Sequence, residues 1–202
     1  MSKYTGPKYR QCRREGVNLF GNEKFNLKKK NYAPGVHGPK GSFSKPSEYA
    51  RQLREKQKLK RLFGVTERQL FNCYTEAAKK KEITGDALLK ILETRLDNAI
   101  FKAGFAKSKP QARQIVNHGF FRVNGKKVDV PSFVVRVGDK IEVIDRQKKS
   151  PLFADLANQK FAPAKWLKAD YSKLTIEVLR DLEAQDLEQA VQTNLVVEYY
   201  SK

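Results

Sequence analysis

The sequence has few of the residues from which disulfide frameworks and metal centres are built. Cys12 and Cys73 are its only two cysteines in 202 residues, and its two histidines, His37 and His118, are isolated. Two distant cysteines do not make a disulfide framework, and structural zinc sites use closely spaced ligand pairs such as Cys-x-x-Cys. We therefore expect no metal site and no cofactor, and we expect Cys73 to be a small buried side chain on a helix.

Long apolar runs are also missing. The chain has no stretch of about 18 apolar residues and no signal-peptide core behind Met1, so no membrane partner or secretion is expected. This favours a place in the cytoplasm, or in an organelle stroma if the protein is organelle-encoded. The sequence also offers no nucleophile–base pair, paired-carboxylate pocket or phosphate-cradling loop, and no enzyme activity is expected.

Positive charge is what the chain has in excess. Lys and Arg number 41 against 22 Asp and Glu, which gives a formal net charge of +19. The net charge is +13 in residues 1–61, +8 in residues 62–150 and −2 in residues 151–202. Such an excess opposes compaction, and Lys or Arg contacts to phosphate release condensed counterions. The first two parts are therefore predicted to face nucleic acid, and the last to face protein or solvent.

Residues 1–46 combine basic residues with glycine, proline and aromatic residues, without a sustained apolar period. Only a short turn of helix is predicted there, around residues 12–16. Two interpretations stay open, a disordered tail and an arm that becomes ordered on RNA. The aromatic content favours the second. The RNA-binding candidates in this arm are Tyr4, Lys8, Arg10, Arg13 and Arg14.

The pattern becomes helical at Ser47, an N-cap candidate, and Gly64 supplies a stop. A capping-box sequence at residues 66–69 opens a second helix, whose apolar stripe includes residues 70, 71 and 74. A third helical segment begins near Thr84 and ends at Gly104, and residues 93–94 are where it could be interrupted. The face of the first helix opposite its apolar stripe is predicted to meet phosphate through Arg51, Arg54, Lys56, Lys58, Lys60 and Arg61.

Residues 94–145 predict a helix, a capped helix, a hairpin and a further strand. A second capping-box sequence, with proline in the first turn, stands at residues 108–111. Asn124-Gly125 between strand-like residues is a strong hairpin signal, because both turn positions need positive φ. A helix N-terminus beside Lys and Arg suits phosphate. The RNA-binding candidates here are Lys107, Ser108, Lys109, Gln111, Arg113, Gln114, Asn117, His118 and Lys126, which Lys127 extends.

The last part of the chain is predicted to contain an acidic helix from about residue 175 to residue 192, followed by a strand-like or docked terminus. An exposed apolar end would risk aggregation, so residues 195–200 are predicted to pack on the helical segment between residues 47 and 62. The candidates for a protein-facing surface are Tyr49, Gln52, Val196, Val197, Tyr199 and Tyr200.

The predicted fold class is α+β. A mainly helical domain, residues 47–93, is completed by residues 160–202. A helix-hairpin RNA-binding domain, residues 94–156, is inserted between them, and residues 1–46 form an irregular basic arm.

Four short motifs in the middle of the chain resemble the RNA-binding domain named after ribosomal protein S4. They are RLDN at residues 95–98, SKPQARQIVNHG at 108–119, VNG at 123–125 and VGD at 137–139. Several RNA-modifying proteins share this domain. Outside it, CRREG at 12–16, PGVHG at 34–38, LREKQK at 53–58 and VVEYYS at 196–201 are similar to the bacterial or organellar ribosomal protein S4 family. The resemblance therefore covers nearly the whole chain.

This resemblance implies a protein that binds small-subunit rRNA directly and early, at a multi-helix junction. It also implies a role in nucleating assembly of the body of the subunit and in decoding accuracy. Ribosomal protein S5 is the implied protein partner, and some family members repress translation of their own message. Lys40 and Lys45 are the implied contacts to mRNA at the entry channel, and self-association is not expected.

The triplet Arg95-Leu96-Asp97 also occurs around the catalytic aspartate of pseudouridine synthases, some of which carry the same RNA-binding domain. Here it lies inside that domain, and no separate catalytic domain fits in the remaining residues. Arg95 is therefore predicted to bind rRNA from a helix face, and Asp97 to meet a neighbouring backbone group or arginine. The alternative function is a free-standing RNA-binding factor or an RNA-modifying enzyme that carries this domain.

Overall fold

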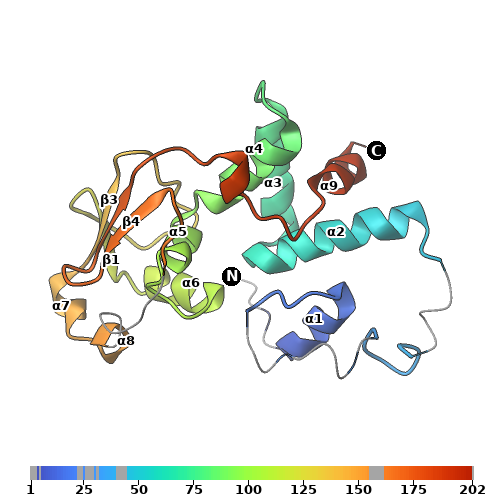
Figure 1. Ribbon diagram of the computed structural model, residues 1–202, viewed down its shortest axis with the longest axis horizontal. Coiled ribbons are helices and arrows are strands. Elements are labelled where there is room, and N and C mark those ends of the chain that lie inside the picture. The colour runs from blue at the N-terminus through green and yellow to red at the C-terminus, as the bar shows by residue number, and fades with distance from the viewer. Residues whose placement is uncertain are drawn as a thin grey trace. The chain divides into compact units, whose positions relative to one another are not determined.

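The computed structural model describes residues 4, 6–21, 25, 30, 32–39, 45–154 and 162–201. The chain divides into two compact units, Met1–Leu88 with Glu188–Lys202, and Leu89–Leu187. We call them unit 1 and unit 2. Unit 1 is helical, and unit 2 combines helices with an antiparallel sheet, so the predicted α+β class is confirmed (Figure 1). Within the described ranges, no helix is long and apolar enough to cross a membrane.

Unit 1 is built from helices whose ends follow local signals. The Ser47 hydroxyl accepts a hydrogen bond from the Ala50 amide at 3.3 Å, and Gly64 ends the helix with φ +61°. Thr66 and Gln69 form the complete capping box that the sequence predicted. The helices are α1 (Lys8–Glu15), α2 (Glu48–Phe63), α3 (Glu67–Ala78), the start of α4 (Thr84–Glu93) and α9 (Thr193–Tyr200).

Helix α9 packs on α2, on the side of α2 away from α1 (Figure 1). The core of unit 1 includes Leu59 of α2, Leu70 of α3 and Val196 of α9, which are fully buried. The predicted docking of residues 195–200 is therefore confirmed. The strand-like alternative is wrong, because residues 193–200 are helical, with Val196 as their one fully buried side chain. Packing on α2 overrides the strand propensity of valine and tyrosine.

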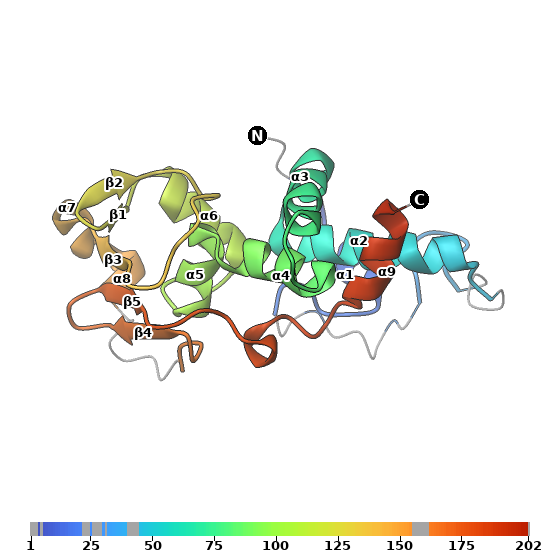
Figure 2. The same cartoon turned by 90° about the horizontal axis from the view of Figure 1, so that it is seen from above.

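Unit 2 carries a five-stranded sheet in the order β2-β1-β3-β5-β4, with every neighbouring pair antiparallel. The predicted hairpin is confirmed, because Asn124 and Gly125 turn the chain with φ +50° and +79°. Figure 2 shows α5 and α6 along one side of the sheet. The strands are β1 (Phe121–Val123), β2 (Lys126–Val128), β3 (Lys140–Val143), β4 (Leu167–Asp170) and β5 (Thr175–Val178). The helices are α5 (Leu96–Lys102), α6 (Lys109–Asn117), α7 (Asp145–Lys148) and α8 (Pro151–Ala154).

The helical segment that was predicted to start near Thr84 is interrupted after Glu93. Arg95 takes an extended conformation and forms an isolated antiparallel bridge with Val134. The amides of Leu96 and Asp97 then donate to the carbonyl groups of Phe133 and Pro131. Residues 94–97 are thereby tied to the loop that precedes β3, and α5 starts in a new direction.

The acidic helix predicted from residue 175 to residue 192 is wrong. Residues 175–178 form β5, in which Ile176 and Val178 are buried while Glu177 is exposed, and only a short 3-10 turn (Ala184–Asp186) follows. This alternation is the period of a strand. Because β5 pairs with β3, the sheet extends past the predicted domain boundary at residue 156. In the structure only residues 188–202 of the C-terminal part belong to unit 1.

Two expectations about side-chain burial also differ from the structure. Cys12 is fully buried, whereas Cys73 is only half-buried. Phe71 was predicted to belong to the buried stripe of α3 but is 49% exposed. The fully buried positions of α3 are Leu70 and Ala77, seven residues apart, and a residue directly after Leu70 is turned about 100° away from that face.

Candidate RNA-binding surfaces

The basic helix α1 belongs to the predicted RNA-binding arm, and it is longer than the predicted turn. Cys12 faces inward with Leu19, and burial raises the pKa of its thiol, so it stays protonated. Arg13 stacks on the Tyr32 ring at 4.6 Å and donates to the Tyr32 and Ala33 carbonyl groups. The remaining candidate cations of this helix are exposed, namely Lys8, Arg10 and Arg14.

The cations of α2 are largely used inside the protein. Arg54 and Arg61 both contact the buried carboxylate of Glu15. Lys58 contacts Glu55 at 2.5 Å and the Ala190 carbonyl group at 3.4 Å. Arg51, by contrast, is exposed. The face of α2 that the sequence predicted to meet phosphate is therefore largely occupied by ion pairs within the protein, and rRNA contact by these residues stays a prediction.

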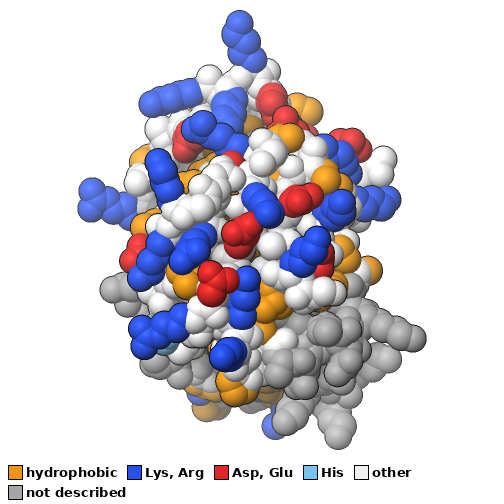
Figure 3. All heavy atoms as spheres, turned by 90° about the vertical axis from the view of Figure 1, so that its left-hand side faces the viewer, with side chains coloured by type: hydrophobic (Ala, Val, Ile, Leu, Met, Phe, Trp, Pro, Cys, Tyr) orange, Lys and Arg blue, Asp and Glu red, His pale blue; other side chains and the backbone are white. Residues whose placement is uncertain are grey.

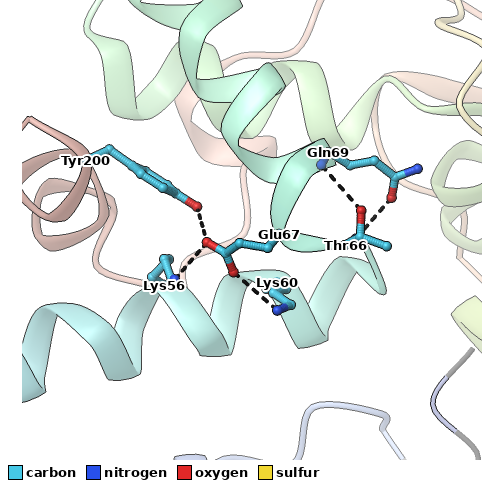
Figure 4. A network of polar contacts seen from close by, with 6 residues as sticks. All are labelled: Lys56, Lys60, Thr66, Glu67, Gln69 and Tyr200. Carbon is cyan, nitrogen blue, oxygen red and sulfur yellow. Dashed lines mark hydrogen bonds and ion pairs between the residues drawn. The ribbon is translucent and has the colours of Figure 1, made fainter. Parts of the chain in front are cut away.

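Lys56 differs most from its predicted exposed position, because it is 5% exposed. Its ammonium lies 2.7 Å from Glu67 and over the Tyr199 ring at 4.4 Å. Glu67 lies at the start of α3, and its carboxylate has two further partners (Figure 4). The Lys60 ammonium lies 3.2 Å from it, and the Tyr200 hydroxyl donates to it at 2.9 Å. Burial works to raise the pKa of Glu67, but these hydrogen bonds outweigh it and lower the pKa. The Glu67 carboxylate thus joins three helices.

The predicted protein-facing surface is only partly at the surface. Gln52 is buried and donates to Glu198 at 3.0 Å, and Val196 is part of the core, so the exposed position predicted for these two is wrong. The other candidates are accessible: Tyr49 is 56% exposed and lies 5.8 Å from Tyr199. Further aromatic rings, half-buried or exposed, lie beside these two. We call the whole set the aromatic surface; it comprises Tyr49, Tyr199, Tyr200, Phe71 and Tyr74.

Phe71 and Tyr74 were not among the predicted interface residues. Their rings lie 5.7 Å and 4.9 Å from that of Tyr200. The sequence placed both in a buried stripe, so nothing in the pattern assigned them to a surface. Only the docking position of α9 brings them beside the C-terminal tyrosines.

In unit 2, most candidates gather around α6 and the hairpin. The Ser108 hydroxyl caps the helix by accepting from the Gln111 amide at 3.4 Å. The predicted reciprocal bond is displaced by one residue, because the Gln111 side chain accepts from the Lys107 amide instead, at 2.9 Å. Several candidates are exposed here: Lys107, Gln114, Asn117, His118 and Lys126.

The β1–β2 hairpin lies close to the C-terminal end of α6. A Cβ atom on Gly119 would lie only 2.4 Å from the Lys127 side chain, and Gly119 has φ +67°. The positive φ favours glycine here, whereas the Lys127 side chain could move aside. The exposed Lys127 therefore lies beside Gly119, which follows Asn117 and His118 in the chain, and it was predicted only as an extension of the surface.

Two predicted RNA contacts of unit 2 pair with the buried carboxylate of Asp97, and their contact with rRNA stays a prediction. Arg95 is 5% exposed and forms a two-bond pair with Asp97, at 3.1 and 3.0 Å. Arg113 reaches the same carboxylate at 3.8 Å. Burial lowers the pKa of Arg113, and Asp97 counteracts this. The predicted arginine partner of Asp97 is thus confirmed, whereas Arg95 and Arg113 are not on an exposed helix face. They connect residues 95–97 to α6.

Charge on the outer side of the sheet is mixed. Arg122 pairs with Asp145 at 3.7 Å, and Lys140 pairs with Glu142 at 2.7 Å. Figure 3 looks at the side of unit 2 that carries the α7 and β3 labels in Figure 1. It shows Lys and Arg side chains spread over this side with acidic groups between them. Phosphate contact is therefore expected at separate points rather than over a uniform basic surface.

Four further candidates are Tyr4, Lys40 and Lys45 of the N-terminal part and Lys109 at the start of α6. Lys45 and Tyr4 are exposed, and Lys40 lies outside the described residues. Lys109 has its ammonium 5.8 Å from the Phe101 ring centre. In the described part of the chain, no group of three His, Cys, Asp or Glu side chains is arranged to hold a metal ion.

Comparison with known proteins covers both units. A family model described as the ribosomal protein S4/S9 N-terminal domain matches residues 3–93, and one described as the S4 domain matches residues 94–141. The border between them falls at the break between α4 and α5. Two similar relatives, each called small ribosomal subunit protein uS4, come from Desulfitobacterium hafniense (44% identical over 209 residues) and Thermus thermophilus (42% over 212). Each alignment covers 100% of both chains.

Proposed function

The chain belongs to the uS4 family of small ribosomal subunit proteins, and from this premise we propose that it is a structural, rRNA-binding protein of the small ribosomal subunit. The observation that carries the proposal is the length of the similarity. Identity of 44% extends over all of this chain and all of its relative, so unit 1 is shared as well as the RNA-binding domain. An RNA-modifying enzyme would share the RNA-binding domain alone.

The arrangement of charge suits recognition of folded RNA. A-form duplexes hide their base edges in a deep groove, so proteins contact their phosphates and shape. The exposed cations of α1 and those around α6 and the hairpin are suited to phosphate contact. Each of them stands on a short helix or hairpin whose position is fixed by contacts within the protein. The net charge of +19 supports a polyanionic partner in the same way.

We further propose the finer role that the family resemblance implies. The protein binds its rRNA early, nucleates assembly of the subunit body and influences decoding accuracy. It meets ribosomal protein S5 through the aromatic surface, and mRNA through Lys45 and Lys40. Its place is the ribosome, in the cytoplasm or in an organelle stroma.

A salt titration tests the phosphate-driven mechanism. If on the order of 8 phosphates are neutralised, the logarithm of affinity for small-subunit rRNA falls against the logarithm of salt concentration with a slope of roughly −6 to −7. Filter binding with a large-subunit rRNA fragment of equal length is the control. A slope near zero would remove the mechanism. Cosedimentation with small subunits through a high-salt wash separates a subunit protein from a free-standing factor.

The protein partner has its own test. Tyr49→Ala removes the most exposed ring of the aromatic surface without touching the core. We expect weaker binding to purified ribosomal protein S5 by calorimetry, with rRNA affinity unchanged. Ile83→Ala, which changes another exposed apolar residue of unit 1, is the matched control. Equal loss of S5 binding in both variants would move the contact elsewhere.

A further inference from the structure

Glu15 is a buried carboxylate in the most basic part of the chain. It is the last residue of α1, and its side chain is fully buried. One of its oxygens, Oε1, contacts the Arg61 guanidinium and lies 3.4 Å from Nη1 of Arg54. Burial raises the pKa of this carboxyl group, and the positive charges of Arg61 and Arg54, with those of Lys58 and Arg14 nearby, counteract the rise. A carboxylate is stable in such a place only when it is paired, and here both arginines come from α2.

This pairing attaches α1 to α2. A helix of eight residues is too short to be stable alone in water, and α1 has no acidic residue in its first turn and no side-chain cap. Its position therefore depends on the buried Cys12 and on the contact of Glu15 with Arg54 and Arg61. The exposed Lys8, Arg10 and Arg14 are placed by that same attachment.

By charge alone, Glu15 opposes binding to a polyanion, because it removes positive charge from a segment that carries +13 in residues 1–61. We propose that Glu15 is a positioning residue for rRNA binding, which fixes α1 on α2 so that Lys8, Arg10 and Arg14 form a preformed phosphate-binding surface. Preformed surfaces bind more tightly because less conformational entropy is lost on binding. The inference rests on the proposed rRNA-binding function.

An effect of charge alone and an effect of positioning predict opposite changes in rRNA affinity for Glu15→Gln. The substitution is nearly isosteric and raises the net charge by one, so charge alone predicts tighter binding. Positioning predicts affinity for small-subunit rRNA about three- to tenfold weaker, with the salt slope reduced in magnitude by about 2 because the α1 cations no longer bind together. Glu67→Gln is the matched control, since Glu67 also contacts two cations of α2 but lies on α3. It is expected to keep the slope.

Hydrogen exchange on the free full-length chain gives a second readout. In Glu15→Gln, the amides of α1 are expected to exchange faster while those of α2 keep their protection. If this variant were unfolded, Glu15→Asp would make the same comparison, because it keeps the charge but shortens the reach by one methylene. Weaker binding with a reduced slope is again the expected result.

Three outcomes would overturn the inference. The first is Glu15→Gln binding as tightly as the wild type, or more tightly, with an unchanged slope. The second is equal loss in the Glu15→Gln and Glu67→Gln variants, which would mean that the helical packing in general is responsible. The third is a wild-type chain that does not bind small-subunit rRNA, and this would overturn the proposed function as well. Only the first two leave that function standing.

Discussion

Val196→Ala measures how firmly α9 is packed on α2. Val196 is fully buried, and the substitution removes two carbon atoms from the core. At about 0.8 kcal/mol per buried methylene the transfer loss is about 1.6 kcal/mol, and the cavity left behind adds to it. Alanine is a better helix former than valine, and this offsets about 0.5 kcal/mol of the loss in unfolding free energy. The expected loss of unfolding free energy in unit 1 is therefore about 1.5–2.5 kcal/mol.

The assay is calorimetric or circular-dichroism melting of the full-length protein. For a cooperative unit of about 100 residues, 1 kcal/mol corresponds to roughly 4–8 °C in Tm, so a fall of about 6–20 °C is expected in the transition of unit 1. Val197→Ala is the matched control, because the neighbouring valine of the same helix is only half-buried. Its loss should stay below about 1 kcal/mol. Equal shifts in the two variants would refute the described packing of α9.

Four further outcomes follow from the structure. The folded-state pKa of Glu67 lies below its ordinary value of 4.5, so its stabilising contribution is present above that pH and is lost as pH falls through the lower folded value; an acid titration of unit 1 should show a loss that Glu67→Gln lacks. Gly125→Ala forces a side chain into φ +79° and should cost about 1 kcal/mol in a denaturant titration of unit 2; an unchanged midpoint would contradict the hairpin. Arg113→Glu puts a second carboxylate against Asp97, so it should destabilise unit 2 by about 2–4 kcal/mol as well as weaken RNA binding. An unaltered melting temperature would contradict the contact between Arg113 and Asp97. Deletion of residues 195–202 should lower the melting temperature of unit 1 and weaken the S5 contact, and loss of rRNA binding alone would contradict this division of the chain.

The elements that could be predicted from the sequence are those with local causes. Ser47, Gly64 and the Thr66 capping box determine helix ends through bonds to residues at most four positions away, and Asn124-Gly125 determines a hairpin in the same way. Such signals are readable in a single sequence because the interacting groups lie close together in it.

The wrong predictions share a different cause. β5 is a strand because its partner β3 lies about 35 residues earlier in the chain, and the acidic residues after it made a solvated helix the simpler interpretation. The basic face of α2 was predicted to meet phosphate because one of its partners is equally remote, since Glu15 is 46 residues from Arg61. Gln52 was predicted to face a protein partner for the same reason, since Glu198 is 146 residues away from it in the chain. Pairings of this kind follow only from the tertiary packing.

These pairings change how the positive charge is to be understood. Glu15 and Glu67 stand at the end of α1 and the start of α3, and each contacts two cations of α2. Moving Arg54 and Arg61 to phosphates would leave the buried carboxylate of Glu15 unpaired, so we expect these two arginines to contact rRNA less readily than an exposed cation does. Helix α2 is then the element on which α1, α3 and α9 are placed, and direct rRNA contact by its cations stays a prediction. We expect direct phosphate contact first from the exposed cations of α1 and of the α6 and hairpin surface, whose positions the paired cations determine.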